Sequence, residues 1–206
     1  MSSPYKNKDR KPEIFIVDDH PLLRQGLAQL INQEDDMISS GEAGDAVEAI
    51  EKIKKAKPDL TVVDISLKGT SGIELTKNLL ANHPKMLVLI ISMYDEAVYL
   101  ERCMKAGAKG YLMKREATDH VITAIRTVLR GDVYVSEKWK DRMVNMFGKW
   151  GAEAKGPSAE RLSDRELEVL QLIGQAFSTQ KIAEELHVSG KTIESHYANI
   201  KNKLDL

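Results

Sequence analysis

The first two thirds of the chain alternate short apolar runs with segments of helical periodicity. This alternation predicts strands at 13–17, 37–43, 60–64, 86–92 and 110–112. It predicts helices from Pro21 onward and over 45–55, 72–82, 95–106 and 116–129. Five strands that each precede a helix imply a parallel sheet covered on both faces. Five are too few for an eight-fold barrel, so we expect an α/β fold of the flavodoxin type, (βα)5, with strand order 2-1-3-4-5.

The composition changes after residue 130. The stretch AEAKGPSAE (152–160) is small and polar and is broken by Gly156 and Pro157, which is typical of a linker, and a short helix is expected before it at 136–147. Three helical patterns follow Leu162, the first of them headed by a capping box of Ser163 and Glu166. We therefore expect a domain at 12–130, a linker at 131–160 and a small all-α helix-turn-helix domain at 161–206.

Composition narrows the class of protein. The net charge is −1, so any nucleic-acid site must be a local patch. The single cysteine, Cys103, excludes an internal disulfide framework and a cysteine-based zinc site. The first dozen residues contain no apolar stretch, and no run approaches the roughly 20 apolar residues of a membrane helix. We expect a cytoplasmic protein without a membrane partner.

Acidic residues stand where the expected strands end. Asp18 and Asp19 end the first strand and Asp64 ends the third. These strands are neighbours in a 2-1-3-4-5 sheet, so their carboxyl ends meet in the crevice where this architecture binds ligands. Two carboxylates about 5 Å apart repel by roughly 3 kcal/mol at an effective dielectric constant of about 20. A cation that neutralises them is therefore expected, and oxygen ligands favour Mg²⁺.

Two further polar residues fall on the same rim. Ser92 ends the fourth strand and Lys114 follows the fifth. A crevice with a divalent cation, a lysine and a hydroxyl can hold a phosphoryl group, and a carboxylate there can act as the nucleophile. The alternative is that the aspartates merely cap the helices that follow them.

The strings IFIVDDHPLLRQGL, VVDISL, IISMYDE and KGYLMK resemble the receiver domain of response regulators of the NarL/FixJ (LuxR-type) branch. The resemblance covers residues 13–129 and implies that Asp64 is the phosphoacceptor. It departs from many receivers at Arg115, where they have proline. It also implies direct metal ligation by Asp19, Asp64 and the Ser66 carbonyl, a metal-bound water on Asp18, contact of Ser92 and Lys114 with the phosphoryl group, and a change in burial of Tyr111.

The last helical pattern has one apolar and one polar face. It begins at Ser189, a plausible N-cap, and its buried stripe consists of Ile193, Tyr197, Ile200 and Leu204. The opposite face is short and polar, as a helix that enters a major groove requires. The alternative is a generic three-helix bundle with a solvated face.

Residues 163–204 are similar to the LuxR-type DNA-binding domain along their whole length. Residues 158–206 carry six Lys and Arg against eight Asp and Glu, whereas 189–204 carry three lysines and one glutamate, so we expect modest non-specific affinity. Lys181 replaces the usual glutamate, and the sequence stops at Leu206, where the family continues into a fourth helix that often pairs protomers. Expected base contacts are Glu194, Ser195 and Ala198, and expected phosphate contacts are Lys181, Lys191, Thr192 and Lys201.

Together these features predict a two-component response regulator that is not an enzyme. The resemblance implies that a sensor histidine kinase phosphorylates Asp64 with Mg²⁺ and that this change controls binding to double-stranded promoter DNA. Two routes stay open: the receiver masks the recognition helix, or the phosphorylated form pairs as a homodimer. An adaptor that binds a protein partner is a rival hypothesis. A metal-dependent phosphohydrolase is disfavoured because no second carboxylate follows Asp64 in Ile65, Ser66 and Leu67.

Overall fold

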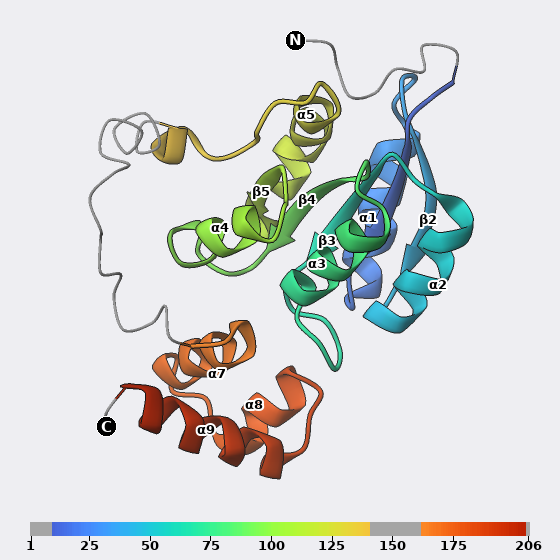
Figure 1. Ribbon diagram of the computed structural model, residues 1–206. Helices are drawn as coiled ribbons and strands as arrows, with labels where there is room; N and C mark the ends of the chain where they lie inside the picture. Colours follow the sequence, from blue (N-terminus) through green and yellow to red (C-terminus); the bar gives the residue numbers. More distant parts are fainter. Residues whose placement is uncertain (1–9, 141–161, 205–206) are drawn as a thin grey trace.

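A computed structural model describes residues 10–140 and 162–204. Figure 1 shows a sheet with helices on both sides and a helical domain beneath it. The five strands are parallel and lie in the order β2-β1-β3-β4-β5, which confirms the predicted fold class. The strands are β1 (Glu13–Val17), β2 (Ile38–Ala43), β3 (Leu60–Asp64), β4 (Leu87–Ser92) and β5 (Gly110–Met113).

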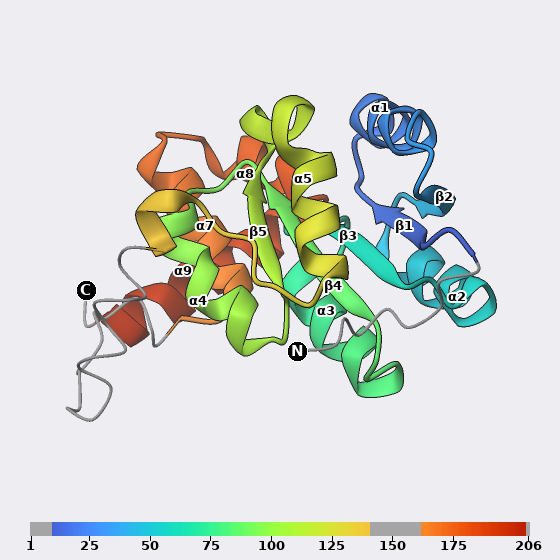
Figure 2. The same ribbon diagram turned by 90° about the horizontal axis from the view of Figure 1, so that it is seen from above.

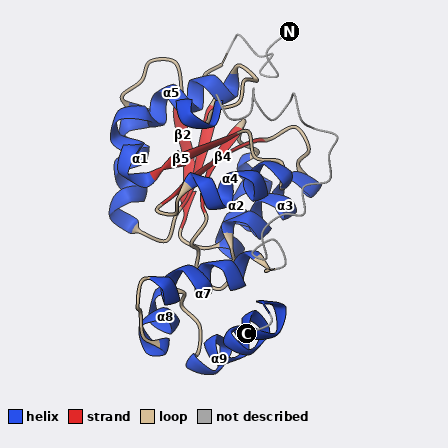
Figure 3. Cartoon of the chain, turned by 90° about the vertical axis from the view of Figure 1, so that its left-hand side faces the viewer, coloured by secondary structure: helices blue, strands red, loops and turns tan. Residues whose placement is uncertain are grey.

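The helices of this domain form two layers around the sheet. α1 and α5 cover one face and α2, α3 and α4 cover the other, as Figure 3 shows from the side. Their apolar stripes supply one core on each face because β3 and β4 are buried on both sides. The helices are α1 (Pro21–Asn32), α2 (Ala46–Ala56), α3 (Gly72–Asn82), α4 (Glu96–Lys105) and α5 (Ala117–Leu129), and a short 3-10 turn at Lys114–Glu116 precedes α5.

Local sequence signals fix where these helices begin. Asp45 caps α2, since its carboxylate accepts a hydrogen bond from the Glu48 backbone at 2.9 Å, as predicted. Ser71 caps α3 and Asp95 caps α4 in the same way. Each cap directly follows a β-α loop, so the helix starts are held close to the rim where the functional side chains lie.

The chain returns along the edge of β5 after α5. Tyr134 accepts a backbone hydrogen bond from Tyr111 at 2.8 Å, and Val135 is buried. The Ser136 backbone donates to the Glu96 carboxylate at 3.0 Å. The chain is helical again at residues 137–140. The rest of the helix expected at 136–147 and the expected linker stretch 152–160 lie outside the described residues.

Three helices build the second domain: α7 (Asp164–Gly174), α8 (Thr179–Glu185) and α9 (Gly190–Leu204). The capping box of Ser163 and Glu166 at the start of α7 is present as predicted. On α9, Ile193 and Ile200 are buried, and Lys203 forms an ion pair of 2.7 Å with Glu166. Figure 1 places α7 between the receiver-like domain and α9, and Figure 2, seen from above, shows this second domain behind α4 and β5.

No helix within residues 10–140 and 162–204 has both the length and the apolar character needed to cross a membrane.

Candidate functional site

The expected acidic cluster is present at the carboxyl end of the sheet. One carboxylate oxygen each of Asp18, Asp19 and Asp64, together with a ring nitrogen of His20, all lie within 4.8 Å of one another. Register explains the convergence, since Val17 pairs with Val63 and the chain then leaves both strands on the same rim. The backbone amide of His20 donates to Asp18 Oδ1 at 2.8 Å, which closes a tight turn after β1.

Lys114 neutralises part of this charge. Its Nζ lies 2.5 Å from Asp64 Oδ2 and 2.8 Å from Asp18 Oδ2, and its side chain is almost fully buried. Burial alone would lower the pKa of Lys114, but the Asp64 and Asp18 carboxylates raise it above its ordinary value. The lysine is therefore a fixed cation at the site.

Asp64 lies at the bottom of the cluster and is 1% exposed. Burial raises the pKa of its carboxyl group to about 8; Lys114 opposes this shift, while the charge of Asp18 adds to it. Burial thus disfavours the charged form of Asp64 even though Lys114 lies beside it. A second cation would stabilise that charged form, so the site is suited to bind one.

The donor set fits a magnesium ion. Asp18 Oδ2 and Asp19 Oδ1 are buried and lack a well-aligned hydrogen bond, although a nitrogen lies close to each, so both oxygens remain available as ligands. Carboxylate oxygens from two strands, with a backbone carbonyl such as that of Ser66 in the adjoining loop, are the ligands that Mg²⁺ prefers.

Ser92, Tyr111 and Ser66 meet around a residue that the sequence did not single out. Tyr94, in the loop after β4, donates its backbone amide to Ser92 Oγ at 3.1 Å and accepts from the Tyr111 hydroxyl at 2.9 Å. Its own hydroxyl accepts from Ser66 Oγ at 3.0 Å, and its ring stacks on Tyr99. Tyr94 thus links the loops after β3 and β4, and only its position in the string IISMYDE could have suggested this.

Arg24 is the second residue that the sequence analysis missed. From the first turns of α1 its Nη1 donates to the Asp18 carbonyl at 2.7 Å, and its Nε pairs with Glu42 at 3.2 Å. It therefore fixes the backbone beneath the acidic cluster. The sequence feature that could have indicated this role is a basic residue one helical turn after Asp18, Asp19 and His20.

The outer face of α9 is open to solvent. Ser189 caps the helix as predicted, because its hydroxyl accepts from the Thr192 backbone at 3.1 Å. The Ser195 hydroxyl donates to the Lys191 carbonyl at 3.0 Å. Among the expected contacts, Thr192 is partly exposed and six residues are exposed: Lys181, Lys191, Glu194, Ser195, Ala198 and Lys201.

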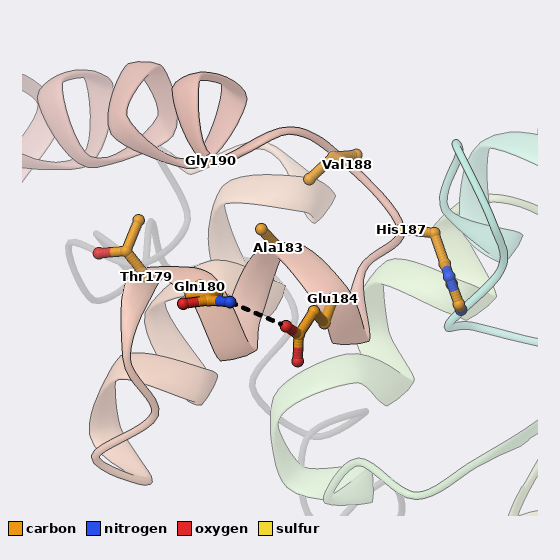
Figure 4. Close-up of a pocket in the computed structure, with 7 residues that line it drawn as sticks. All are labelled: Thr179, Gln180, Ala183, Glu184, His187, Val188 and Gly190. Carbon is orange, nitrogen blue, oxygen red and sulfur yellow. Dashed lines mark hydrogen bonds between the residues drawn. The ribbon is translucent and has the colours of Figure 1, made fainter.

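An open hollow lies between α8 and the start of α9. Figure 4 shows the side chains that line it, with Gln180 donating to Glu184 at 3.3 Å. Thr179, Ala183 and Val188 complete most of its wall. The hollow borders the expected DNA-binding face at Gly190, the first residue of α9.

Comparison with known proteins shows the family. The model for the response regulator receiver domain matches residues 14–126, and the model for bacterial regulatory proteins of the luxR family matches residues 160–206. The chain belongs to the response regulators. It is similar to the oxygen regulatory protein NreC of Staphylococcus carnosus (strain TM300), with 39% identity over 198 residues that cover 94% of this chain and 91% of that protein.

Solved structures agree with this assignment. A two-component response regulator of the LuxR family from Aurantimonas sp. SI85-9A1 has a TM-score of 0.62 and 29% identity and covers 68% of this chain and 99% of its own. The two-component response regulator RcsB, solved as a complex with DNA, has a TM-score of 0.60 and 25% identity and covers 95% of this chain and 92% of its own. The response regulator is a DNA-binding transcription regulator and not an enzyme, as the sequence predicted.

Proposed function

We propose that this response regulator accepts a phosphoryl group on Asp64 and couples it to promoter binding through α9. The observation that carries the proposal is the convergence of Asp64 with Asp18, Asp19 and Lys114 at one rim. We divide the chain into a receiver at 12–130, a linker at 131–160 and a DNA-binding domain at 161–206. The phosphoryl donor is a sensor histidine kinase.

Magnesium would be held by Asp18, Asp19, Asp64 and the carbonyl of Ser66. When bound, it supplies positive charge against the oxygens of the phosphoryl group. Lys114 would contribute a second cation, which already lies 2.5 Å from Asp64 and is almost fully buried.

The transfer exchanges one bond to phosphorus for another. An Asp64 oxygen forms a bond to phosphorus while the P–N bond of the donor phosphohistidine breaks, and the imidazole regains a proton. Lys114 and the Ser92 hydroxyl would then contact the new phosphoryl oxygens. Because the Ser92 hydroxyl is the acceptor for the Tyr94 amide, its movement would release the loop that holds the Tyr111 hydroxyl.

In the DNA-binding domain, α9 would enter the major groove with Glu194, Ser195 and Ala198 toward base edges. The cations Lys181, Lys191 and Lys201, with Thr192, would contact phosphates.

Selection from a randomised DNA duplex library tests this function. With Mg²⁺ and beryllofluoride, the wild-type chain is expected to enrich a defined sequence and to bind it more tightly than without beryllofluoride. Asp64→Asn is expected to bind the same sequence without any response to beryllofluoride. If no sequence is enriched in any state, the chain acts as a protein-binding adaptor and the proposal is wrong.

A further inference from the structure

An ion pair joins the start of α7 to the receiver. Asp164 Oδ1 lies 2.8 Å from Arg102 Nη1 of α4, and its Oδ2 lies 3.3 Å from Lys77 Nζ of α3. Asp164 is buried and the Arg102 side chain is 20% exposed, so solvent screens this pair less than an open surface pair. Figure 3 shows α7 directly beneath the receiver.

A second contact reaches the acidic cluster itself. His187 lies in the turn between α8 and α9, where its backbone is left-handed with φ 52°. Its Nε2 lies 3.4 Å from Asp19 Oδ2. In Figure 4 the His187 ring points away from the hollow toward ribbon in the colours of the receiver. The turn of the helix-turn-helix therefore rests against the pocket that contains Asp64.

A third contact comes from the second turn of α7. Glu168 of α7 is fully buried and pairs with Arg165 at 2.6 Å. After burial, the charge of Glu168 is the next largest cause that raises the pKa of both Tyr94, in the loop after β4, and Tyr99 of α4, so this carboxylate lies near both side chains. The DNA-binding domain thus adjoins two of the loops that surround Asp64.

The interface is not fully satisfied. Within the described residues, the Tyr99 hydroxyl near Glu168 is buried and has no hydrogen-bond partner. A buried polar group without a partner costs free energy that water restores when the site opens. A few ion pairs therefore stabilise the closed arrangement, and the buried polar group without a partner destabilises it. An interface with this balance is able to open.

Closure covers one functional site and leaves the other free. The Asp19 carboxylate at the rim of the phosphoacceptor pocket contacts His187 of the second domain, whereas Lys191, Ser195 and Ala198 on α9 are all exposed. In this arrangement the receiver does not mask the expected DNA-contacting face. What lies under the second domain is the phosphoacceptor pocket.

We propose that the DNA-binding domain is a lid that restricts access of phosphoryl donors to Asp64. The inference rests on the proposed role of Asp64 as phosphoacceptor. A donor must approach the carboxylate in line with the bond that breaks, so transfer proceeds only through the fraction of molecules whose lid is open. Phosphorylation and closure then exclude one another, and weakening the Asp164 contact speeds phosphorylation.

The test is the initial rate of phosphorylation of the full chain by acetyl phosphate and Mg²⁺, followed by intact mass. Asp164→Asn is expected to react about tenfold faster than wild type, since it removes a charge-assisted hydrogen bond that holds the lid. Arg102→Gln removes the same contact by a change in the receiver. A faster rate in this variant therefore cannot result from a folding defect of α7. The double variant is expected to react no faster than either single variant. Glu185→Gln, which removes an exposed carboxylate of the same domain, is expected to match wild type.

Two further readouts separate a lid from a general loosening of structure. Small-angle scattering should give a larger radius of gyration for Asp164→Asn than for Glu185→Gln. The affinity of unphosphorylated Asp164→Asn for DNA should differ from that of unphosphorylated wild type by less than threefold. Equal rates for wild type, Asp164→Asn and Arg102→Gln would overturn the lid and leave the role of Asp64 intact. If none of these proteins is labelled, the proposed function fails, and the lid with it.

Discussion

Lys114 Nζ lies 2.5 Å from Asp64 Oδ2, although the two residues are 50 positions apart in the sequence. The same ammonium group reaches Asp18 at 2.8 Å. A single lysine thus bridges the ends of β1 and β3, and its charge stabilises the cluster before any metal binds.

Lys114→Met tests this role. The change leaves Asp18 and Asp64 buried without their ammonium partner, so the free energy of unfolding without metal should fall by about 3 kcal/mol. Mg²⁺ should stabilise the variant more than wild type, because the ion takes over charge that the lysine supplied. Urea unfolding with and without Mg²⁺ measures both effects. Lys55→Met, at an exposed position of α2, is the control, and equal stability of the two variants would contradict the prediction.

Gly72 permits the close approach of α3 to the phosphoacceptor. A Cβ at this position would lie 1.9 Å from the Asp64 carbonyl oxygen, so Gly72→Ala must displace the end of β3. We expect a loss of about 3 kcal/mol in unfolding free energy and a large drop in phosphorylation rate. Gly26→Ala, in α1 with nothing within 4 Å, should instead stabilise the protein by about 0.5–1 kcal/mol.

The two classes of DNA contact on α9 should respond differently to salt. Lys201→Ala removes a phosphate contact, so it should weaken binding to all duplexes alike and reduce the magnitude of the slope of log K against log salt by about 1. Ser195→Ala should leave that slope unchanged and relax preference at one base position. Titration of a selected and a scrambled duplex at several salt concentrations measures both. A salt slope that Lys201→Ala leaves unchanged would remove this lysine from the phosphate contacts.

His196 makes the DNA-binding domain sensitive to acid. Its Nδ1 is buried without a hydrogen-bond partner in the described structure, and burial lowers the pKa of this histidine below its ordinary value. Below about pH 6.5 the unfolded chain takes up a proton that the folded domain resists, so stability falls as the pH drops. Hydrogen exchange of α9 amides at about pH 7 and pH 5.5, corrected for intrinsic rates, should show this loss. His196→Gln should reduce it, whereas His120→Gln, at an exposed position of α5, should not.

The sequence was sufficient for the parts of the fold that periodicity and caps determine. The strand ends at Val17 and Asp64 follow from short apolar runs, and the sheet order follows from the βα alternation. Because that order brings particular strand ends together, it also predicts the acidic cluster and the position of Lys114 beside it.

Other features depend on contacts that a linear pattern does not encode. The role of Tyr94 arises from packing between two loops, and that of Gly72 from the approach of a helix to a backbone carbonyl. The position of the second domain depends on complementary side chains such as Asp164 and Arg102, which are 62 residues apart. The sequence leaves masking of the recognition helix open, whereas the contacts of Asp164 and His187 show which surfaces of the second domain face the receiver.

Chemical location of the phosphoryl group tests the central claim most directly. The full chain would be phosphorylated with acetyl phosphate and Mg²⁺ and reduced with borohydride, which converts an aspartyl phosphate into homoserine, and its peptides sequenced by mass spectrometry. The account predicts homoserine at position 64 in wild type and none in Asp64→Asn. Homoserine at Asp18 or Asp19 in place of Asp64, or none at any position of a chain that folds and binds Mg²⁺, would contradict it.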